Sequence, residues 1–198
     1  MTLLPENPSQ SASVRTALRR ERLAAREAMP EHLHAEASTC IEALLFQELS
    51  RTTPATLAFC WPIQREFDPL PLAMRLDALG WRLCMPVVVT PKAPMAFHRW
   101  TPDTTMEPGH FGIPVPTDVT VLQPDVVLLP LVAFDNFGYR IGYGGGYFDR
   151  TLAELKPQPF CIGIGFELGR ADTIHPEPHD VPLDAWVTEA GWFTATPA

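Results

Sequence analysis

Glycines, arginines and an aspartate lie close together in the stretch GYRIGYGGGYFDR, residues 138–150. Four of the five residues 142–146 are glycines, and because glycine costs backbone entropy inside a helix, this segment is predicted to be a loop. The backbone N–H groups of such a loop, followed by a helix that starts near Tyr147, form a site for an anion such as phosphate. Arg140 and Arg150 flank the loop and can donate forked hydrogen bonds to phosphate oxygens.

Asp149 adds a negative charge beside this predicted anion site. That arrangement is favourable when a hard cation such as Mg²⁺ lies between the carboxylate and the anion. A glycine cluster alone is also typical of a tight turn between a strand and a helix that binds nothing. The segment is not a P-loop, because no Lys-Ser/Thr pair follows the glycines, and it comes too late in the chain for a dinucleotide-binding fingerprint.

A second group of basic residues lies in a helix that we predict from Ser13, with Ser13 as its N-cap. Arg15, Arg19, Arg22 and Arg26 recur at steps of four, three and four, which places them on one helical face. One interpretation is a solvated stripe balanced by neighbouring glutamates. The other is that the first two arginines contact phosphates.

The rest of the chain supplies the elements that must position these residues. Apolar runs predict strands at 56–61, 81–89, 95–100, 126–131, 160–166 and 185–188. Helical patterns fall at 31–49, 70–79 and 147–155. This alternation predicts a three-layer α/β/α fold with a mostly parallel sheet. The Glu66 loop and the glycine loop both follow strands, so we expect them at one edge of the sheet, where such sheets bind ligands.

Composition narrows the class of protein. The 198 residues predict one folded domain over 13–198, preceded by a flexible tail over 1–12. The net charge of -8 argues against nucleic-acid binding, and no apolar run approaches the length of a membrane span. The four cysteines form no CxxC pair, so neither a zinc site nor a disulfide framework is expected. We expect a monomeric, cytoplasmic protein.

The run LPLVAFDNFGYRIGYGGGYFDR closely resembles the signature of the 5-formyltetrahydrofolate cyclo-ligases, also called methenyltetrahydrofolate synthetases. The matching residues are Pro130, Phe134, Asp135, Gly138, Arg140, Gly142, Gly144, Gly146, Tyr147 and Asp149. Ile141 and Phe148 replace a Leu and a Tyr of the pattern, and Val115 stands where the family often has Glu. The resemblance implies a CoA-transferase-like and sugar-phosphate-isomerase-like sheet. It also implies MgATP-dependent conversion of 5-formyltetrahydrofolate to 5,10-methenyltetrahydrofolate.

The same resemblance implies a set of site residues. Catalytic roles fall to Arg140 and Tyr147. ATP would be bound by Arg15, Arg19, Arg140, Gly142, Gly144, Gly145, Gly146, Tyr147 and Phe148. The folate would be bound by Trp61, Glu66, Tyr143, Gly144, Gly145, Gly146 and Tyr147, and Mg²⁺ by Asp149 and Asp184.

Several alternatives stay open. Trp61 is equally well explained as a core aromatic, and His110 and Phe111 either line the pocket or are structural. A zinc site at His175 and His179 has little support, because the two histidines lie among prolines without a helix. As whole functions, a sugar-phosphate isomerase or CoA-transferase-type enzyme would need a carboxylate or lysine base and no ATP. A non-catalytic regulator would bind the nucleotide without turnover.

Overall fold

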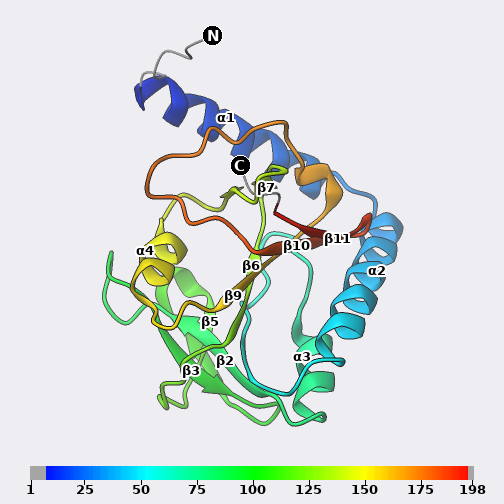
Figure 1. The fold of residues 1–198 in the computed structure, drawn as a ribbon, viewed down its shortest axis with the longest axis vertical. Coiled ribbons are helices and arrows are strands. Elements are labelled where there is room, and N and C mark those ends of the chain that lie inside the picture. The colour runs from blue at the N-terminus through cyan, green and yellow to red at the C-terminus, as the bar shows by residue number, and fades with distance from the viewer. Residues whose placement is uncertain (1–7, 196–198) are drawn as a thin grey trace.

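A seven-stranded sheet forms the centre of the computed structural model, which describes residues 8–195 (Figure 1). Its strand order is β11-β10-β9-β6-β1-β2-β3. The bounds are β1 Thr56–Ala58, β2 Arg82–Val87, β3 Ala96–Trp100, β6 Val126–Pro130, β9 Phe160–Ile164, β10 Ala185–Thr188 and β11 Gly191–Thr194. Strands β10, β9, β6, β1 and β2 are parallel, and an antiparallel strand closes each edge. The mostly parallel α/β sheet predicted from the sequence is therefore confirmed.

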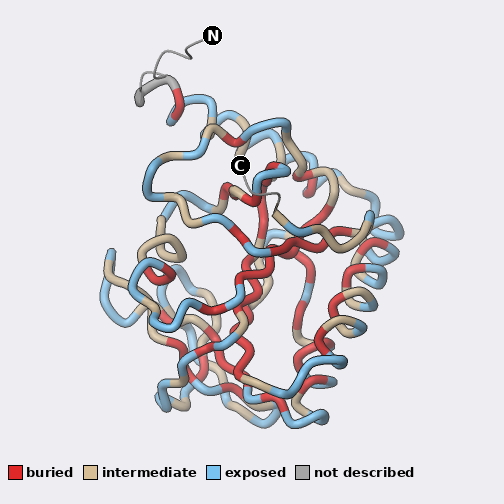
Figure 2. Tube along the Cα trace, in the orientation of Figure 1, coloured by how far each residue is buried: buried red, intermediate tan, exposed pale blue. Residues whose placement is uncertain are grey.

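Helices cover both faces of this sheet. Helices α2 (Glu31–Leu49) and α3 (Leu70–Asp77) share one apolar cluster with the sheet, and α4 (Tyr147–Glu154) contributes Leu152 to a second cluster. Neighbouring strand residues alternate between the two clusters, since Leu57 belongs to the first and Ala58 to the second. The buried residues follow the sheet and the inner side of α2 (Figure 2). The result is a three-layer arrangement.

The first helix begins earlier than the sequence analysis predicts. Helix α1 spans Pro8–Glu27, so Ser13 is an exposed residue inside the helix and not its N-cap. Proline is tolerated in the first turn of a helix, where its missing N–H has no partner to lose, and so Pro8 can begin α1. Residues 8–12 are therefore helical and not part of a tail. The remaining part of the predicted tail, residues 1–7, lies outside the described residues.

Short paired segments account for the elements that the sequence analysis missed. Two small hairpins pair β4 (Met106–Pro108) with β5 (Pro114–Pro116) and β7 (Ala133–Phe134) with β8 (Arg140–Ile141). Single turns η1 (His110–Gly112) and η2 (Glu167–Gly169) are 3₁₀-helical. Strands of two or three residues carry too little periodicity to be read from sequence, because their hydrogen-bonding partners define them.

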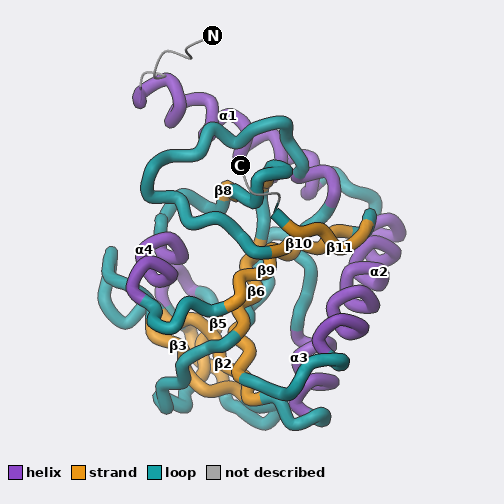
Figure 3. Tube along the Cα trace, viewed as in Figure 1, coloured by secondary structure: helices purple, strands orange, loops and turns teal. Residues whose placement is uncertain are grey.

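The segments outside helices and strands form much of the upper half of the molecule in the view of Figure 3. The longest of them there, the 171–184 loop, runs from η2 to β10 and lies against α1. Among residues 8–195, no helix has both the length and the apolar character needed to cross a membrane.

Helix α2 offers a direct test of the packing. Leu45 is fully buried between α2 and the sheet, so Leu45→Ala is expected to lower the free energy of unfolding by about 2–5 kcal/mol. Leu33 lies on the same helix but is 43% exposed, and Leu33→Ala should cost less than about 1 kcal/mol. Urea denaturation measures both. Equal losses for the two variants would contradict the placement of α2.

Candidate active site

The glycine loop, residues 142–146, ends where α4 begins, as predicted, and follows β8, a short strand that the sequence analysis missed. Gly144 has φ +89° and Gly146, the residue before α4, has φ +62°. Residues with a Cβ rarely adopt this left-handed backbone, so these two positions require glycine. The loop thus presents bare backbone directly before a helix N-terminus, which is the arrangement expected of an anion site.

Two arginines flank this loop. Arg19, from α1, donates from Nε to the carbonyl oxygen of Gly142 at 2.6 Å. A Cβ built on Gly144 would lie 3.4 Å from the Arg19 guanidinium, so the side chain lies against the loop. Arg150, from α4, donates from Nη2 to the carbonyl oxygen of Gly145 at 2.5 Å. Burial, and secondarily the charge of Arg15, lower the pKa of Arg19. Arg19 therefore lies beside the glycine loop, while its predicted contact with ATP stays a prediction.

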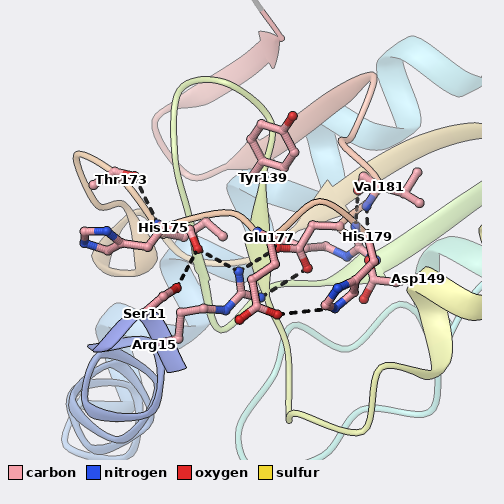
Figure 4. A network of polar contacts seen from close by, with 12 residues as sticks. Ser11, Arg15, Tyr139, Asp149, Thr173, His175, Glu177, His179 and Val181 are labelled. Carbon is pink, nitrogen blue, oxygen red and sulfur yellow. Dashed lines mark hydrogen bonds and ion pairs between the residues drawn. The ribbon is translucent and has the colours of Figure 1, made fainter. Parts of the chain in front are cut away.

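Arg15 has a different partner. Its Nη1 and Nη2 donate to the two carboxylate oxygens of Asp180 at 2.6 and 3.2 Å. Nη1 also donates to the carbonyl oxygen of His175 at 3.1 Å, an oxygen that Ser11 also approaches (Figure 4). Arg15 therefore ties α1 to the 171–184 loop. The ATP contact predicted for it stays a prediction, and the guanidinium would have to leave Asp180 to make that contact.

A second buried ion pair lies at the first turn of α4. Arg140 is 7% exposed; its Nη1 donates to the carbonyl oxygen of Val181 at 2.7 Å and its Nη2 to Asp149 Oδ1 at 3.0 Å. The same Oδ1 accepts from the backbone N–H of Val181 at 3.3 Å (Figure 4). The phosphate contact predicted for Arg140 stays a prediction. Within the described residues, both hydrogen bonds of Asp149 use Oδ1, which leaves Oδ2 able to meet a cation.

Asp184, the second predicted metal ligand, binds a backbone N–H group. Asp184 Oδ2 accepts from the N–H of Cys161 at 2.7 Å, where β9 begins. Among residues 8–195, no group of three or more His, Cys, Asp or Glu side chains is arranged to hold a metal ion. Mg²⁺ does not require such a group, because it binds proteins through one or two carboxylates and completes its shell with phosphate and water. Asp149 fits this chemistry, and the metal role of Asp184 stays a prediction.

Aromatic side chains gather beside the glycine loop. The Tyr147 hydroxyl accepts from the N–H of Lys92 at 3.3 Å and lies 3.4 Å from His110 Nε2. The rings of His110 and Phe111 are 6.1 and 6.3 Å from the Tyr147 ring, and Phe111 is 73% exposed. The structure brings these two loop residues to the site. In the sequence, their position in a proline-rich segment was the sole indication that they line the site.

Two predicted ligand contacts pack toward the interior. Phe148 is half-buried and packs against the cluster that contains Leu152. Trp61 is half-buried and packs against the cluster on the α2 face, as its core interpretation predicts. Neither side chain projects freely from the surface, and their ligand contacts stay predictions.

Glu66 and Tyr143 meet although 77 residues separate them in the chain. The Tyr143 hydroxyl donates to Glu66 Oε1 at 2.7 Å, and the N–H of Ile63 donates to Oε2 at 2.9 Å. Glu66 is 8% exposed, and burial raises its pKa, while these hydrogen bonds and the charge of Arg26 oppose the rise. Burial and the Glu66 charge also raise the pKa of Tyr143. The glycine loop therefore combines the glycines of the predicted anion site with a tyrosine that is bonded to a buried carboxylate.

Comparison with known proteins identifies the family of this chain. The family model described as the 5-formyltetrahydrofolate cyclo-ligase family matches residues 11–189. The chain belongs to this family. The matched residues include both the glycine loop and the Glu66 loop.

Individual cyclo-ligase relatives extend the comparison. The 5-formyltetrahydrofolate cyclo-ligase of Haemophilus influenzae is 38% identical over 95 residues, which cover 45% of this chain and about half (51%) of that protein. The Escherichia coli K12 protein of the same name is 34% identical over 142 residues, 67% of this chain and 77% of that one. The NMR structure of Aquifex aeolicus 5,10-methenyltetrahydrofolate synthetase superposes with a TM-score of 0.78, at 27% identity, over 93% of this chain and 94% of that chain.

The left-handed glycine of the loop can be tested against a matched glycine elsewhere. Gly144→Ala should lower the free energy of unfolding by about 1–2 kcal/mol through backbone strain. It should also weaken nucleotide binding about tenfold or more, because the new methyl group would lie between the loop and the Arg19 guanidinium.

Gly80 provides the control, since it has the same φ of +89° after α3 and nothing within 4 Å of a built Cβ. Gly80→Ala should cost similar stability and leave nucleotide affinity unchanged. Chemical denaturation and calorimetric titration with MgATP separate the two effects. Equal nucleotide affinity for both variants would argue against an anion site at Gly144.

Proposed function

We propose that this chain catalyses the ATP- and Mg²⁺-dependent cyclisation of 5-formyltetrahydrofolate to 5,10-methenyltetrahydrofolate, with release of ADP and phosphate. One observation carries the proposal. The glycine loop has Arg19 and Arg150 on its flanks, and the Tyr143 hydroxyl of the same loop is bonded to Glu66. The backbone that would bind phosphate and the tyrosine that holds Glu66, the proposed pterin acceptor, therefore lie on one loop of five residues. Membership of the cyclo-ligase family supports this assignment.

The chemistry needs alignment and charge neutralisation more than a protein nucleophile. In the proposed reaction, the formyl oxygen attacks the γ-phosphorus of ATP, the P–O bond to ADP breaks, and the formyl group becomes a phosphorylated, electrophilic carbon. The neighbouring folate nitrogen then attacks that carbon and loses its proton. The C–O bond breaks, and the former formyl oxygen leaves with phosphate. Phosphoryl transfer of this kind is catalysed mainly by positioning and electrostatics.

Different residues would bind the nucleotide and the folate. The N–H groups of the glycine loop, Arg19 and Arg150 would bind the nucleotide phosphates and stabilise the charge of the transferring group. Glu66 would accept hydrogen bonds from the amino and ring N–H groups of the pterin. Tyr147, at the start of α4, would border both ligands.

Magnesium has one clear candidate ligand in this arrangement. Asp149 lies in the first turn of α4, and only its Oδ1 is used by Arg140 and Val181. A Mg²⁺ ion bound there would neutralise the nucleotide phosphates and draw charge from the transferring group. Arg140 would fix the orientation of the Asp149 carboxylate from the other side.

The rival functions predict different chemistry. A sugar-phosphate isomerase or CoA-transferase-type enzyme would use a carboxylate such as Glu66 as its base and would not consume ATP. A regulator would bind MgATP and leave the folate unchanged. In the proposed function, one ADP appears for every methenyl product.

The direct test mixes the purified chain with MgATP and 5-formyltetrahydrofolate. The methenyl chromophore should appear with an equal amount of ADP, and omission of either ATP or Mg²⁺ should abolish it. Absorbance spectroscopy and a coupled ADP assay measure the two products. MgATP binding without the chromophore would favour the regulator instead.

The role of Asp149 is tested by Asp149→Asn, because an amide oxygen can still accept from Val181 whereas the charge is lost. The variant should need at least about tenfold more Mg²⁺ for half-maximal turnover. It should also unfold more easily, since the buried Arg140 loses its counter-ion.

Asp180→Asn is the matched control for this variant, because Asp180 likewise forms an ion pair with an arginine but lies on the 171–184 loop. It should lose stability without a change in the Mg²⁺ requirement. Magnesium titrations of turnover and thermal unfolding report the two quantities. An unaltered Mg²⁺ requirement in Asp149→Asn would remove Asp149 from the metal site.

A further inference from the structure

The last turn of α1 buries an arginine that one interpretation of the sequence placed in a solvated stripe. Arg26 is 3% exposed. Arginine keeps its charge in proteins, and a buried charge is tolerated only when it is well paired. The position of Arg26 therefore depends on the groups that receive its hydrogen bonds.

Those groups belong to two segments far along the chain. Arg26 Nη1 donates to the carbonyl oxygen of Leu131 at 3.2 Å, where β6 ends. Arg26 Nη2 donates to the Tyr143 hydroxyl at 2.7 Å, and that hydroxyl lies 2.7 Å from Glu66 Oε1. Three side chains, from α1, the glycine loop and the loop after β1, thus form one chain of hydrogen bonds.

The chemistry of the two outer groups, the Arg26 guanidinium and the Glu66 carboxylate, fixes the direction of these hydrogen bonds. A guanidinium can only donate and an ionised carboxylate can only accept. The Tyr143 oxygen must therefore accept from Arg26, and its single proton must point at Glu66. Because the N–H of Ile63 holds Oε2 at 2.9 Å, both carboxylate oxygens have a fixed partner and keep a further lone pair.

We propose that Arg26 is a positioning residue for the folate: through the Tyr143 hydroxyl, it holds the Glu66 carboxylate in the orientation that accepts the pterin N–H groups. The inference rests on the proposed function, since it concerns the same ligand. Arg26 does not touch the folate. It acts through Tyr143 and Glu66, and its loss leaves the glycine-loop contacts of Arg19 and Arg150 in place.

Electrostatics supports the same role. A carboxyl group as buried as Glu66 is driven toward its neutral form, and burial raises its pKa. The nearby charge of Arg26 opposes that rise. A protonated Glu66 would present a donor to the pterin N–H groups in place of an acceptor, so the arginine preserves the form of the side chain that recognition requires.

The test compares Arg26→Met with Arg20→Met, which removes the same charge from an exposed position of α1. Arg26→Met should raise the KM for 5-formyltetrahydrofolate about tenfold or more, because an acceptor loses its orienting partner. Its KM for ATP should stay within about twofold of the unaltered chain. Arg20→Met should change neither constant. Equal effects on the two substrates would overturn the inference.

A double-mutant cycle tests whether Arg26 acts through the Tyr143 hydroxyl. Tyr143→Phe removes the hydroxyl that transmits the effect, so adding Arg26→Met to it should raise the folate KM by less than about twofold more. Additive effects would mean that Arg26 acts on folding or on another contact, and would overturn the inference. Arg26→Lys keeps the charge but not the two-nitrogen fork, and should restore part of the folate affinity.

Two outcomes keep this test separate from that of the function itself. If the unaltered chain gives no methenyl chromophore with MgATP and 5-formyltetrahydrofolate, the proposed function fails. If it gives the chromophore but Arg26→Met matches Arg20→Met, only the positioning role fails. Should Arg26→Met not fold, as judged by circular dichroism, Arg26→Lys replaces it in the cycle with the same expected non-additivity.

Discussion

The contact between α1 and the glycine loop is the interaction on which the site depends. A loop of glycines has almost no side chains with which to fix itself, so its conformation must be held by neighbours. Arg19 does this from α1 by binding the carbonyl oxygen of Gly142, while Arg26 binds the hydroxyl of Tyr143 and orients that side chain alone. Arg15 meanwhile binds Asp180 and holds the 171–184 loop to the same helix. One helical face thus organises segments more than 100 residues away.

The distribution of charge explains how an acidic chain can hold an anion. The net charge is -8, yet the glycine loop lies between guanidinium groups. Arg15 and Arg140 are neutralised by Asp180 and Asp149, whereas Arg19 and Arg150 meet backbone carbonyl oxygens at the loop. A carbonyl dipole orients a guanidinium without cancelling its charge. The positive potential therefore remains at the glycines, where a phosphate would approach.

Placing both ligands on one loop has a physical consequence. In the proposed function the glycines would hold the phosphates, and Tyr143 reaches the buried carboxylate, so a displacement of the loop would alter both ligand environments together. Phosphoryl transfer between two bound molecules needs such a common frame, since the attacking oxygen and the phosphorus must meet in line. The loop is short and joins β8 directly to α4, so its two ends are fixed by these elements.

The sequence by itself determined the layers, the glycine loop and the family. Helix α2 begins and ends as its apolar spacing predicts, and the buried runs of β6, β9 and β10 start at the predicted residues, because periodicity and apolar runs are local signals. Only the tertiary structure decided which arginine of the α1 stripe meets the glycines, which binds an aspartate and which is buried. A helical spacing of three or four residues gives these arginines the same local signal, and their partners lie 100 or more residues away. The inward packing of Phe148 could not be predicted from local sequence either. The side of α4 that faces the core depends on how the helix packs against the sheet.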